Sequence, residues 1–411
     1  MYSDIPVYAV AGKNYGDEGK GLATDYFVLK RTSCPSDSLV IRHNGGAQAG
    51  HTVDMSDGRR FVFHQLSSGS FRGASTLWAD TFMPDLYKLE EELSDFKCIS
   101  SLPSVYASLN SCPALIDDVL LNQALEDARG EERHGSCGMG INEAGLRVKA
   151  GFGVTVADFL GKSARDLRAG LLEIRQNYLP VRLSQIGSEV TLPDEYMKLL
   201  KDKNVIDNYI DTCLYNAERL KGVDDKEISK LIGNSSGLVF EGAQGLLLDQ
   251  DYEEGAPNLT SSKTGLDNPL KFTEKFNLKL TEVCYVSRSY VTRHGNGSLP
   301  LELKDAPFED KTNVTNKWQG TLRYASHVSP GDFVLHVEND ISRCPGSVVS
   351  LMLTHLNETG GRLLMDGGYA DIRSVDTIKE TFAGIYESYS PFAEEVKCDN
   401  ALQELYRTIK L

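Results

Sequence analysis

Short, continuous apolar runs recur along the chain, and segments with apolar residues at every third or fourth position lie between them. Continuous runs rich in β-branched side chains are typical of strands that are buried on both faces of a parallel sheet. The runs that we interpret as strands are Val7–Ala11, Leu39–Arg42, Gly237–Phe240, Val283–Val291 and Phe333–Val337. The segments that we interpret as helices are Leu22–Lys30, Ala114–Ala128, Ala164–Asn177, Asp194–Leu200, Ile206–Ile232 and Asn400–Leu411.

Strands that alternate with helices predict an α/β fold with a large, mainly parallel central sheet and flanking helices. The sequence contains no repeat, no low-complexity stretch and no linker rich in proline, glycine or serine. We therefore predict one domain over residues 1–411, with helical insertions at about residues 105–235.

Composition and charge exclude several classes of protein. The chain has 411 residues, of which 41% are apolar and 25% charged, which is ordinary for a globular enzyme and unlike a disordered or fibrous protein. The net charge of -15 provides no general basic surface for nucleic acid or an anionic membrane. The apolar runs are too short to span a bilayer, no signal peptide is evident, and the eight cysteines show no CxxC pair. We expect a soluble, cytoplasmic protein that binds neither nucleic acid nor membrane.

A glycine-rich loop follows the first predicted strand and precedes the first predicted helix. Backbone N–H groups converge at such a junction and bind phosphate, and Lys20 supplies the positive charge expected beside it. The spacing differs from a strict Walker A motif at Asn14 and Gly21. Asp17 is unusual, because an acid inside a phosphate site is unfavourable unless it binds a metal or moves a proton.

Two further clusters have the same character. Asn44–Thr52 is a glycine loop after the second predicted strand, and its His51 is a candidate proton donor to a developing phosphate charge. Val239–Gly245 carries Glu and Gln between small residues, although a satisfied buried glutamine beside a turn explains that run equally well. For His336 and His355 we expect structural roles.

Six motifs in order resemble one family, the adenylosuccinate synthetases. In the family these motifs read WGDEGKGK, GGHNAGHT, FHLLPSG, FEGAQG, TSS and TRVGEG. The corresponding segments of this chain are Tyr15–Leu22 (YGDEGKGL), Gly45–Thr52 (GGAQAGHT), Phe63–Gly69 (FHQLSSG), Phe240–Gly245 (FEGAQG), Thr260–Ser262 (TSS) and Thr292–Gly297 (TRHGNG). The matches cover about the first three-quarters of the chain, and the part from about residue 330 to 411 is divergent.

The resemblance implies a P-loop-like nucleotide site and a two-step reaction. The family uses GTP to phosphorylate the 6-oxygen of inosinate and then displaces that phosphate with the amine of aspartate. By motif, Asp17 would be the base at N1 and a Mg²⁺ ligand, His51 the acid, and Gln244 the residue that holds the purine. The carbonyl of Gly50 would be the second metal ligand, and the family is a homodimer. The residues to which the resemblance assigns nucleotide or phosphate contacts are Gly16, Glu18, Gly19, Lys20, Gly21, Gln48, Ala49, Gly50, Thr52, Cys137 and Thr260.

The chain departs from the family at several places. Gln48 replaces an Asn, and in residues 134–140 Cys137 and Met139 replace a Thr and an Arg. In the family, one subunit of the dimer offers an arginine to the other. In this chain the corresponding residue would be Arg147 or Lys149, or it is absent.

Two further departures affect substrate choice. The aspartate loop, TTTGRxRR in the family, reads Asp310–Trp318 here and contains no arginine, so only Lys311 and Lys317 offer cations there. The guanine-reading TKLD is matched with Val337–Asp340, which places Glu338 where the family has Lys, and no GPxR-like segment follows.

These observations predict an NTP-dependent ligase that joins an amino acid amine to C6 of a purine nucleotide through a 6-phosphoryl intermediate. L-aspartate, an IMP-like nucleotide and GTP or ATP are the expected substrates. The alternatives are a paralogue that uses another purine nucleotide, ATP or another amine, and a non-catalytic nucleotide-binding protein. Retention of Asp17, Lys20, His51 and Gln244 together favours an enzyme.

Overall fold

A ten-stranded sheet forms the centre of the computed structural model, which describes residues 5–187, 190–310 and 320–409. Neighbouring strands are parallel except at one edge, where β16 runs antiparallel to β15. In sheet order the strands are β16 (Lys397–Cys398), β15 (Gly384–Glu387), β12 (Val348–Thr354), β9 (Glu282–Arg288), β1 (Val7–Gly12), β8 (Leu238–Gly245), β2 (Leu39–Arg42), β5 (Ser75–Trp78), β6 (Val105–Ser108) and β7 (Lys221–Val223). The predicted α/β class with a large, mainly parallel sheet is confirmed.

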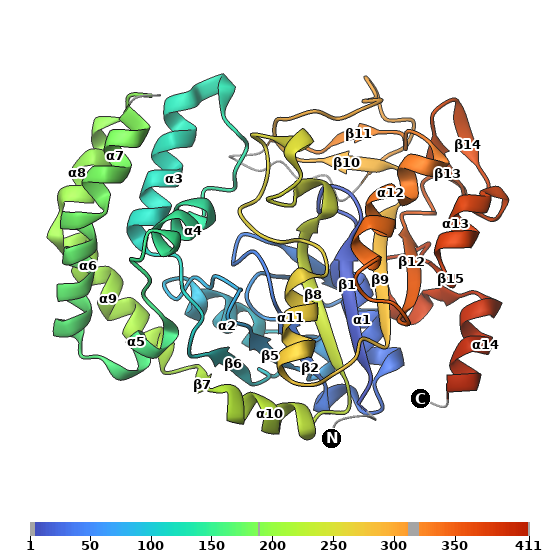
Figure 1. The fold of residues 1–411 in the computed structure, drawn as a ribbon, viewed down its shortest axis with the longest axis horizontal. Helices are drawn as coiled ribbons and strands as arrows, with labels where there is room; N and C mark the ends of the chain where they lie inside the picture. The colour runs from blue at the N-terminus through green and yellow to red at the C-terminus, as the bar shows by residue number, and fades with distance from the viewer. Residues whose placement is uncertain (1–4, 188–189, 311–319, 410–411) are drawn as a thin grey trace.

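Helices cover both faces of this sheet (Figure 1). Along β1, Val7, Ala9 and Ala11 pack into one core, and Tyr8 and Val10 pack into the core on the opposite face. Burial of each large apolar side chain of this kind stabilises the fold by roughly 1.5–3 kcal/mol. The helices on the first face are α10 (Asp225–Gly233), α11 (Asp267–Lys275), α12 (Pro330–Ile341) and α13 (Asp376–Thr381), and those on the second are α1 (Lys20–Arg31) and α14 (Asn400–Ile409).

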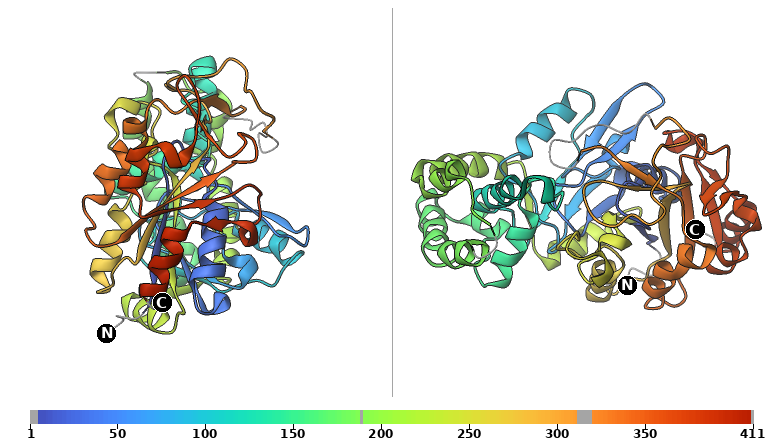
Figure 2. Two further views of the ribbon diagram at one scale, coloured as in Figure 1. Left: turned by 90° about the vertical axis from the view of Figure 1, so that its right-hand side faces the viewer. Right: turned by 90° about the horizontal axis from the view of Figure 1, so that it is seen from above.

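A group of helices lies beyond the β7 edge of the sheet. It is on the left in Figure 1 and on the left of the right-hand view in Figure 2. Two separate apolar cores hold it together. Its helices are α3 (Ile116–Arg129), α4 (Ile141–Lys149), α5 (Val156–Gly161), α6 (Ala164–Asn177), α7 (Leu179–Gly187), α8 (Asp194–Lys201) and α9 (Lys203–Ala217). The remaining elements are α2 (Leu89–Lys97) and the pairs β3 (His51–Asp54) with β4 (Arg60–Phe63), β10 (Val291–Arg293) with β11 (Arg323–Ala325), and β13 (Leu363–Met365) with β14 (Gly368–Ala370).

Three sequence expectations were wrong. The predicted strand at Phe333–Val337 is part of helix α12, which Ser329 caps by accepting a hydrogen bond from the backbone N–H of Asp332. The predicted helix from Ile206 to Ile232 is interrupted by strand β7, and a new helix begins after Asp224. The predicted strand at Val283–Val291 is two strands, β9 and β10, with different partners.

Two general expectations can be compared with the structure. Each of the eight cysteines has a free thiol, as expected for a chain without a disulfide framework. Within the part of the chain that the structure describes, none of the helices is both long and apolar enough to cross a bilayer.

Candidate active site

The three predicted loops meet at the carboxyl end of β1, whose neighbours are β8 and β9. Ligands of open α/β sheets bind at such a point, where the chain connections change direction. The side chain of Asn44 bonds both the N–H and the carbonyl of Ala243, at 2.7 and 2.9 Å, and so joins the second loop to the third. A Cβ on Gly12 would lie 2.5 Å from the carbonyl oxygen of Gln244, so this close approach of the first loop to the third requires glycine.

A carboxylate of the chain itself occupies the anion site of the first loop. The N–H groups of Asn14 and Gly16 donate to Oε1 of Glu18 at 2.9 and 2.7 Å, and Nζ of Lys20 donates to Oε2 at 2.9 Å. The side chains of Glu18 and Lys20 are both buried. These donors therefore bond a carboxylate of the loop itself, and a phosphate that uses them must displace Glu18 or share them with it.

The neighbouring glycines allow close packing. Gly19 has a φ of 98° and would place a Cβ 3.1 Å from the side chain of Thr354. A Cβ on Gly21 would lie 2.7 Å from the carbonyl oxygen of Thr52, so helix α1 begins directly against strand β3.

Asp17 is held by its backbone, and part of its carboxyl is left accessible. Nε of Arg288 donates to the carbonyl oxygen of Asp17 at 2.5 Å, and Nε2 of His294 lies 3.8 Å from Oδ1. About a third of the side chain, 32%, is exposed. Burial raises the pKa of Asp17 above its ordinary value, although the nearby His294 and Arg288 oppose the rise. The result is a more basic carboxylate than an ordinary aspartate.

A buried carboxylate orients His51. Nδ1 of His51 lies 2.6 Å from Oε1 of Glu241. Oε1 also accepts a hydrogen bond from the hydroxyl of Ser68, and Oε2 accepts one from the backbone N–H of Ser68. Burial alone would raise the pKa of Glu241, but Arg42 together with His51 and Ser68 lowers it to about 2. Glu241 is therefore ionised, Nδ1 of His51 donates to it, and Nε2 is left for a ligand.

We expect His51 to be neutral in the free protein. Burial lowers its pKa to about 4, against the opposing effect of Glu241. A bound phosphate favours the imidazolium, so the pKa should rise when nucleotide and Mg²⁺ bind. NMR titration of the ring signals measures both values, and an ordinary pKa near 6.5 in the free protein would contradict this account.

Gln244 has a strained backbone at the centre of the site. Its φ of 63° is in the left-handed region, which raises the free energy of a non-glycine residue by about 1–3 kcal/mol. A Cβ on Gly16 would lie 3.1 Å from Oε1 of Gln244, so the amide lies directly beside the first loop. Such strain is typical of functional positions and favours a ligand-binding role over a satisfied buried glutamine.

Some buried polar atoms without a partner belong to residues in or next to these loops. In the part of the chain that the structure describes, such atoms occur in His43, Gln48 and His294, and also in residues away from the loops, such as Arg31 and Tyr178. Buried polar atoms in proteins nearly always have partners, so those of His43, Gln48 and His294 are candidate contacts for polar groups of a ligand.

The other predicted site residues differ in their burial and in their contacts. Ala49 is buried and its carbonyl oxygen lies 3.0 Å from Nδ1 of His64, whereas Gly50 is exposed. Thr260 bonds the carbonyl of Leu248 through its N–H, at 2.9 Å. Burial raises the pKa of Cys137 to about 11, so its thiol is neutral and supplies no charge to a phosphate. No contact joins Thr52, Cys137 or Thr260 to the side chain of Asp17 among the described interactions.

Two buried carboxylates of the site, Glu241 and Glu92, have structural roles that sequence reasoning did not assign. Glu92 of helix α2 is buried and accepts hydrogen bonds from three consecutive N–H groups, those of His64, Gln65 and Leu66. This contact fixes the segment that presents Ser68 to Glu241. The signal for Glu241 was available, because a charged residue inside an apolar strand is buried and needs partners.

The match of Val337–Asp340 with a guanine-reading segment was wrong. These residues lie in helix α12, where Val337 is fully buried and Asp340 accepts hydrogen bonds from the N–H of Leu266 and the hydroxyl of Tyr285. The sequence THLN at Thr354–Asn357 shares the Thr and Leu of TKLD and begins at the last residue of strand β12. The hydroxyl of Thr354 donates to the carbonyl of Glu18 at 2.7 Å, which places this segment beside the first loop.

The arginines considered for substrate or partner contacts are committed within the chain. Arg147 is 1% exposed and donates to Asp118 at 2.8 Å. Arg323 forms a two-pronged ion pair with Glu302, and Arg293 donates to the carbonyls of Ser298 and Asn258. Lys311 and Lys317 lie outside the described residues.

Two sets of groups, one of which includes a backbone carbonyl, have the chemistry to hold a cation. Mg²⁺ prefers oxygen ligands, and the accessible carboxylate of Asp17 and the carbonyl of the exposed Gly50 are of this kind. A different set, Asp310, His355 and Glu358, brings one ligand atom of each residue within 4.8 Å of the others.

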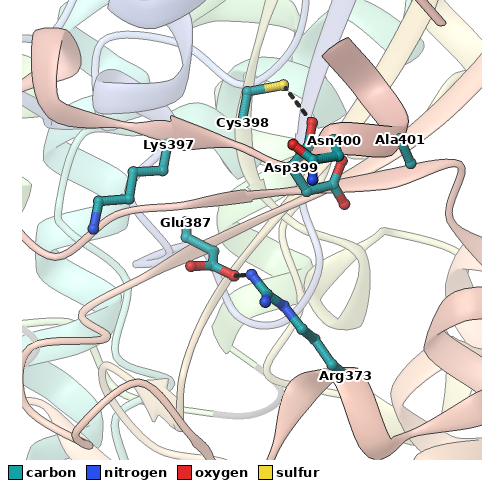
Figure 3. A pocket seen from close by; sticks show the side chains of 7 residues that line it. All are labelled: Arg373, Glu387, Lys397, Cys398, Asp399, Asn400 and Ala401. Atoms are coloured by element: carbon teal, nitrogen blue, oxygen red, sulfur yellow. Dashed lines mark hydrogen bonds and ion pairs between the residues drawn. The ribbon is translucent and has the colours of Figure 1, made fainter. Parts of the chain in front are cut away.

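A surface pocket of about 420 Å³ lies elsewhere, at the β16 edge of the sheet (Figure 3). It is lined by residues of β15, β16 and the start of α14, and its ion pair joins Arg373 to Glu387. This pocket does not mark the active site, because it contains none of the predicted site residues and its Arg373 is 74% exposed.

Comparisons with known proteins identify the family and the fold. The sequence model of the adenylosuccinate synthetase family matches residues 9–322. The chain is 28% identical over 303 residues to the adenylosuccinate synthetase of Mesoplasma florum, a match that covers 73% of this chain and 66% of the relative. The chain thus spans about two-thirds of the length of that relative.

Two solved structures share the fold. One is the fully ligated adenylosuccinate synthetase from Plasmodium falciparum, with a TM-score of 0.70, 18% identity and coverage of 96% of this chain and 100% of that chain. The other is the cyanophage S-2L succinoaminodeoxyadenylate synthetase (PurZ) bound to dGMP and to dATP as an energy donor, with a TM-score of 0.61, 16% identity and coverage of 98% and 99%.

Proposed function

The chain belongs to the adenylosuccinate synthetase family, and on that premise we propose that it is a ligase that joins an amino acid amine to C6 of a purine nucleotide. The observation that carries the proposal is the meeting of three loops at one end of the sheet, where Asp17 is partly accessible and His51 is oriented by Glu241. The proposed substrates are a purine nucleoside monophosphate, GTP or ATP, and L-aspartate. Because these nucleotides are intracellular, we place the reaction in the cytoplasm.

In the first proposed step the 6-oxygen attacks the terminal phosphorus of the donor. The carboxylate of Asp17 removes the proton from N1, which makes the amide-like oxygen a better nucleophile. A bond forms between O6 and phosphorus, the bridging P–O bond breaks, and the nucleoside diphosphate leaves. His51 donates a hydrogen bond or a proton to the transferring phosphoryl group. Lys20 and the N–H groups of the first loop, which bond Glu18 in the structure, stabilise the phosphoryl charge once the phosphate displaces Glu18 or shares these donors with it.

In the second proposed step the amine attacks C6, and the C6–O bond breaks to release phosphate. Gln244 holds the purine in place beside the first loop during both steps. Mg²⁺, held by Asp17 and the carbonyl of Gly50, would neutralise phosphate charge when bound.

The donor and the acceptor nucleotide remain open within this proposal. The structural neighbour from cyanophage S-2L binds dGMP and uses dATP, so a deoxy or 2-amino purine nucleotide and an adenine donor are both candidates here. In this chain His355 and Asn357 lie in the segment after β12 that contacts the first loop, where the family motif has Lys and Asp.

Another amine is the second candidate for the nucleophile. A dicarboxylate is normally gripped by a forked arginine, but Arg323 pairs with Glu302 and Arg293 bonds backbone carbonyls. We keep aspartate as the first choice because it is the family's substrate, and we expect it to bind weakly.

We propose a homodimer, in keeping with the family. Arg147 is unavailable to a partner because its guanidinium is buried against Asp118. Lys149, which is exposed at the end of α4, is the remaining candidate of the two residues considered.

A substrate panel tests the proposal. We expect purified protein, incubated with purine monophosphates, GTP, ATP or dATP, and single amino acids, to form an amino acid adduct whose mass identifies both partners. Nucleoside diphosphate and phosphate should appear in equal amounts with it. An Asp17→Asn sample provides the background rate.

Two outcomes would change the proposal. An adduct formed efficiently only from neutral or singly charged amines would identify a different nucleophile. Nucleotide binding without an adduct in any combination would identify a non-catalytic nucleotide-binding protein.

A further inference from the structure

Asp310, His355 and Glu358 converge from two separate segments of the chain. Asp310 lies in the connection between β10 and β11, and His355 and Glu358 both lie in the segment that follows strand β12. One ligand atom of each residue lies within 4.8 Å of the other two. The carboxyl of Asp310 is 1% exposed, so this is a sheltered cluster and not an acidic surface.

The hydrogen bonds of Thr354 fix which ring nitrogen of His355 has a lone pair. Oγ1 of Thr354 donates its one proton to a backbone carbonyl, that of Glu18 at 2.7 Å. The same oxygen lies 2.9 Å from Nδ1 of His355 and must therefore accept from Nδ1–H. Nε2 is left unprotonated, and an outer hydrogen bond of this kind is what orients a metal-binding histidine.

The carboxylates have similar outer partners. Oδ2 of Asp310 accepts from Arg288 at 2.7 Å and from Tyr324 at 3.2 Å, and Glu358 accepts from the hydroxyl of Tyr290. Hydrogen bonds of this kind to a carboxylate are the outer contacts that orient metal ligands.

We propose that Asp310, His355 and Glu358 bind a divalent transition-metal ion, Zn²⁺ or Mn²⁺, at a site separate from the Mg²⁺ site assigned to Asp17 and Gly50. Two carboxylate oxygens and one imidazole nitrogen suit ions that accept nitrogen as well as oxygen, whereas Mg²⁺ and Ca²⁺ prefer oxygen alone.

The consequence of this site is a rigid support for the catalytic loop. Arg288, which pairs with Asp310, donates to the carbonyl of Asp17 at 2.5 Å, and Thr354, which bonds His355, donates to the carbonyl of Glu18. A bound ion would fix the ends of β9 and β12 relative to each other and so fix both carbonyls. Because the ion binds the folded state, it should also raise the melting temperature.

The test measures binding of Mn²⁺ alone to the full chain. A chelator first removes bound metal from the protein, and no nucleotide is present. The EPR signal of free Mn²⁺ reports how much of the ion has bound. We expect one equivalent to bind, to show nitrogen coupling from an imidazole, and to be displaced by Zn²⁺. His355→Ala and Glu358→Gln should each weaken binding at least about tenfold. His336→Ala, in another partly buried histidine, and Asp17→Asn should bind as the unaltered protein does.

Several results would overturn the proposal. These are no binding at millimolar Mn²⁺, unchanged affinity in His355→Ala or Glu358→Gln, and loss of binding in Asp17→Asn. If either cluster variant fails to fold, the nitrogen coupling in the unaltered protein decides, because its absence excludes His355 as a ligand. The measurement reads metal binding, so it stands apart from the ligase reaction.

Discussion

Replacement of Asp17 by asparagine is expected to lower turnover by at least about 10²–10⁴-fold at saturating Mg²⁺. Asparagine has nearly the same shape but cannot take the N1 proton, and it is a weaker ligand for a cation. The fold should be unchanged, because Arg288 contacts the backbone carbonyl of Asp17 and not its carboxyl. Steady-state rates with the substrates identified by the panel, beside circular dichroism, measure both effects.

The matched control is Asp57→Asn, which alters an exposed aspartate on the turn between β3 and β4. We expect it to retain the full rate. An Asp17→Asn variant with a near-normal rate would show that the base has been assigned to the wrong residue.

Replacement of His51 by alanine is expected to lower turnover by roughly 10²–10³-fold, the usual effect of removing one donor to a transition-state charge. The loss should appear in kcat more than in KM, since the donor acts on the transferring phosphoryl group. His336→Ala is the control, because this partly buried histidine of α12 lies outside the three loops. A loss of equal size in both variants would mean that the effect is structural.

The Glu241→Gln variant tests how Glu241 orients His51, because it leaves the imidazole itself in place. The carboxylate faces Arg42 and bonds His51 and Ser68, and all of these groups are buried. The variant should be less stable because a buried charge loses its partner, an effect of about 3–5 kcal/mol. In the folded fraction we expect the pKa of His51 to fall further, because the variant loses the carboxylate that favours the imidazolium while the positive charge of Arg42 stays in place.

Much of the fold could be predicted because its physical signals are local. The buried strands Val7–Gly12 and Leu39–Arg42 are continuous apolar runs, and the helix at Ala164–Asn177 has a capping serine and a regular apolar stripe. Phe333–Val337 failed because a short apolar run has no distinguishing period, and the decisive signals, Ser329 and Pro330, lie before it.

The candidate site was predictable in its loops and not in its internal contacts. Glycines, Lys20 and Asp17 at the end of an apolar strand indicate an anion site from the sequence alone. The occupation of that site by Glu18, the support of His51 by Glu241 and the burial of Arg147 depend on contacts between residues far apart in the chain. No spacing rule in a single sequence encodes such contacts.

The central claim is that the reaction passes through a 6-phosphoryl purine nucleotide. The most direct test is turnover of a purine monophosphate that carries ¹⁸O at C6, followed by mass spectrometry of the products. We predict that the label appears in the released phosphate, because the 6-oxygen leaves on phosphorus when the amine attacks C6. Label that remains in the nucleotide or is found in water would contradict the account.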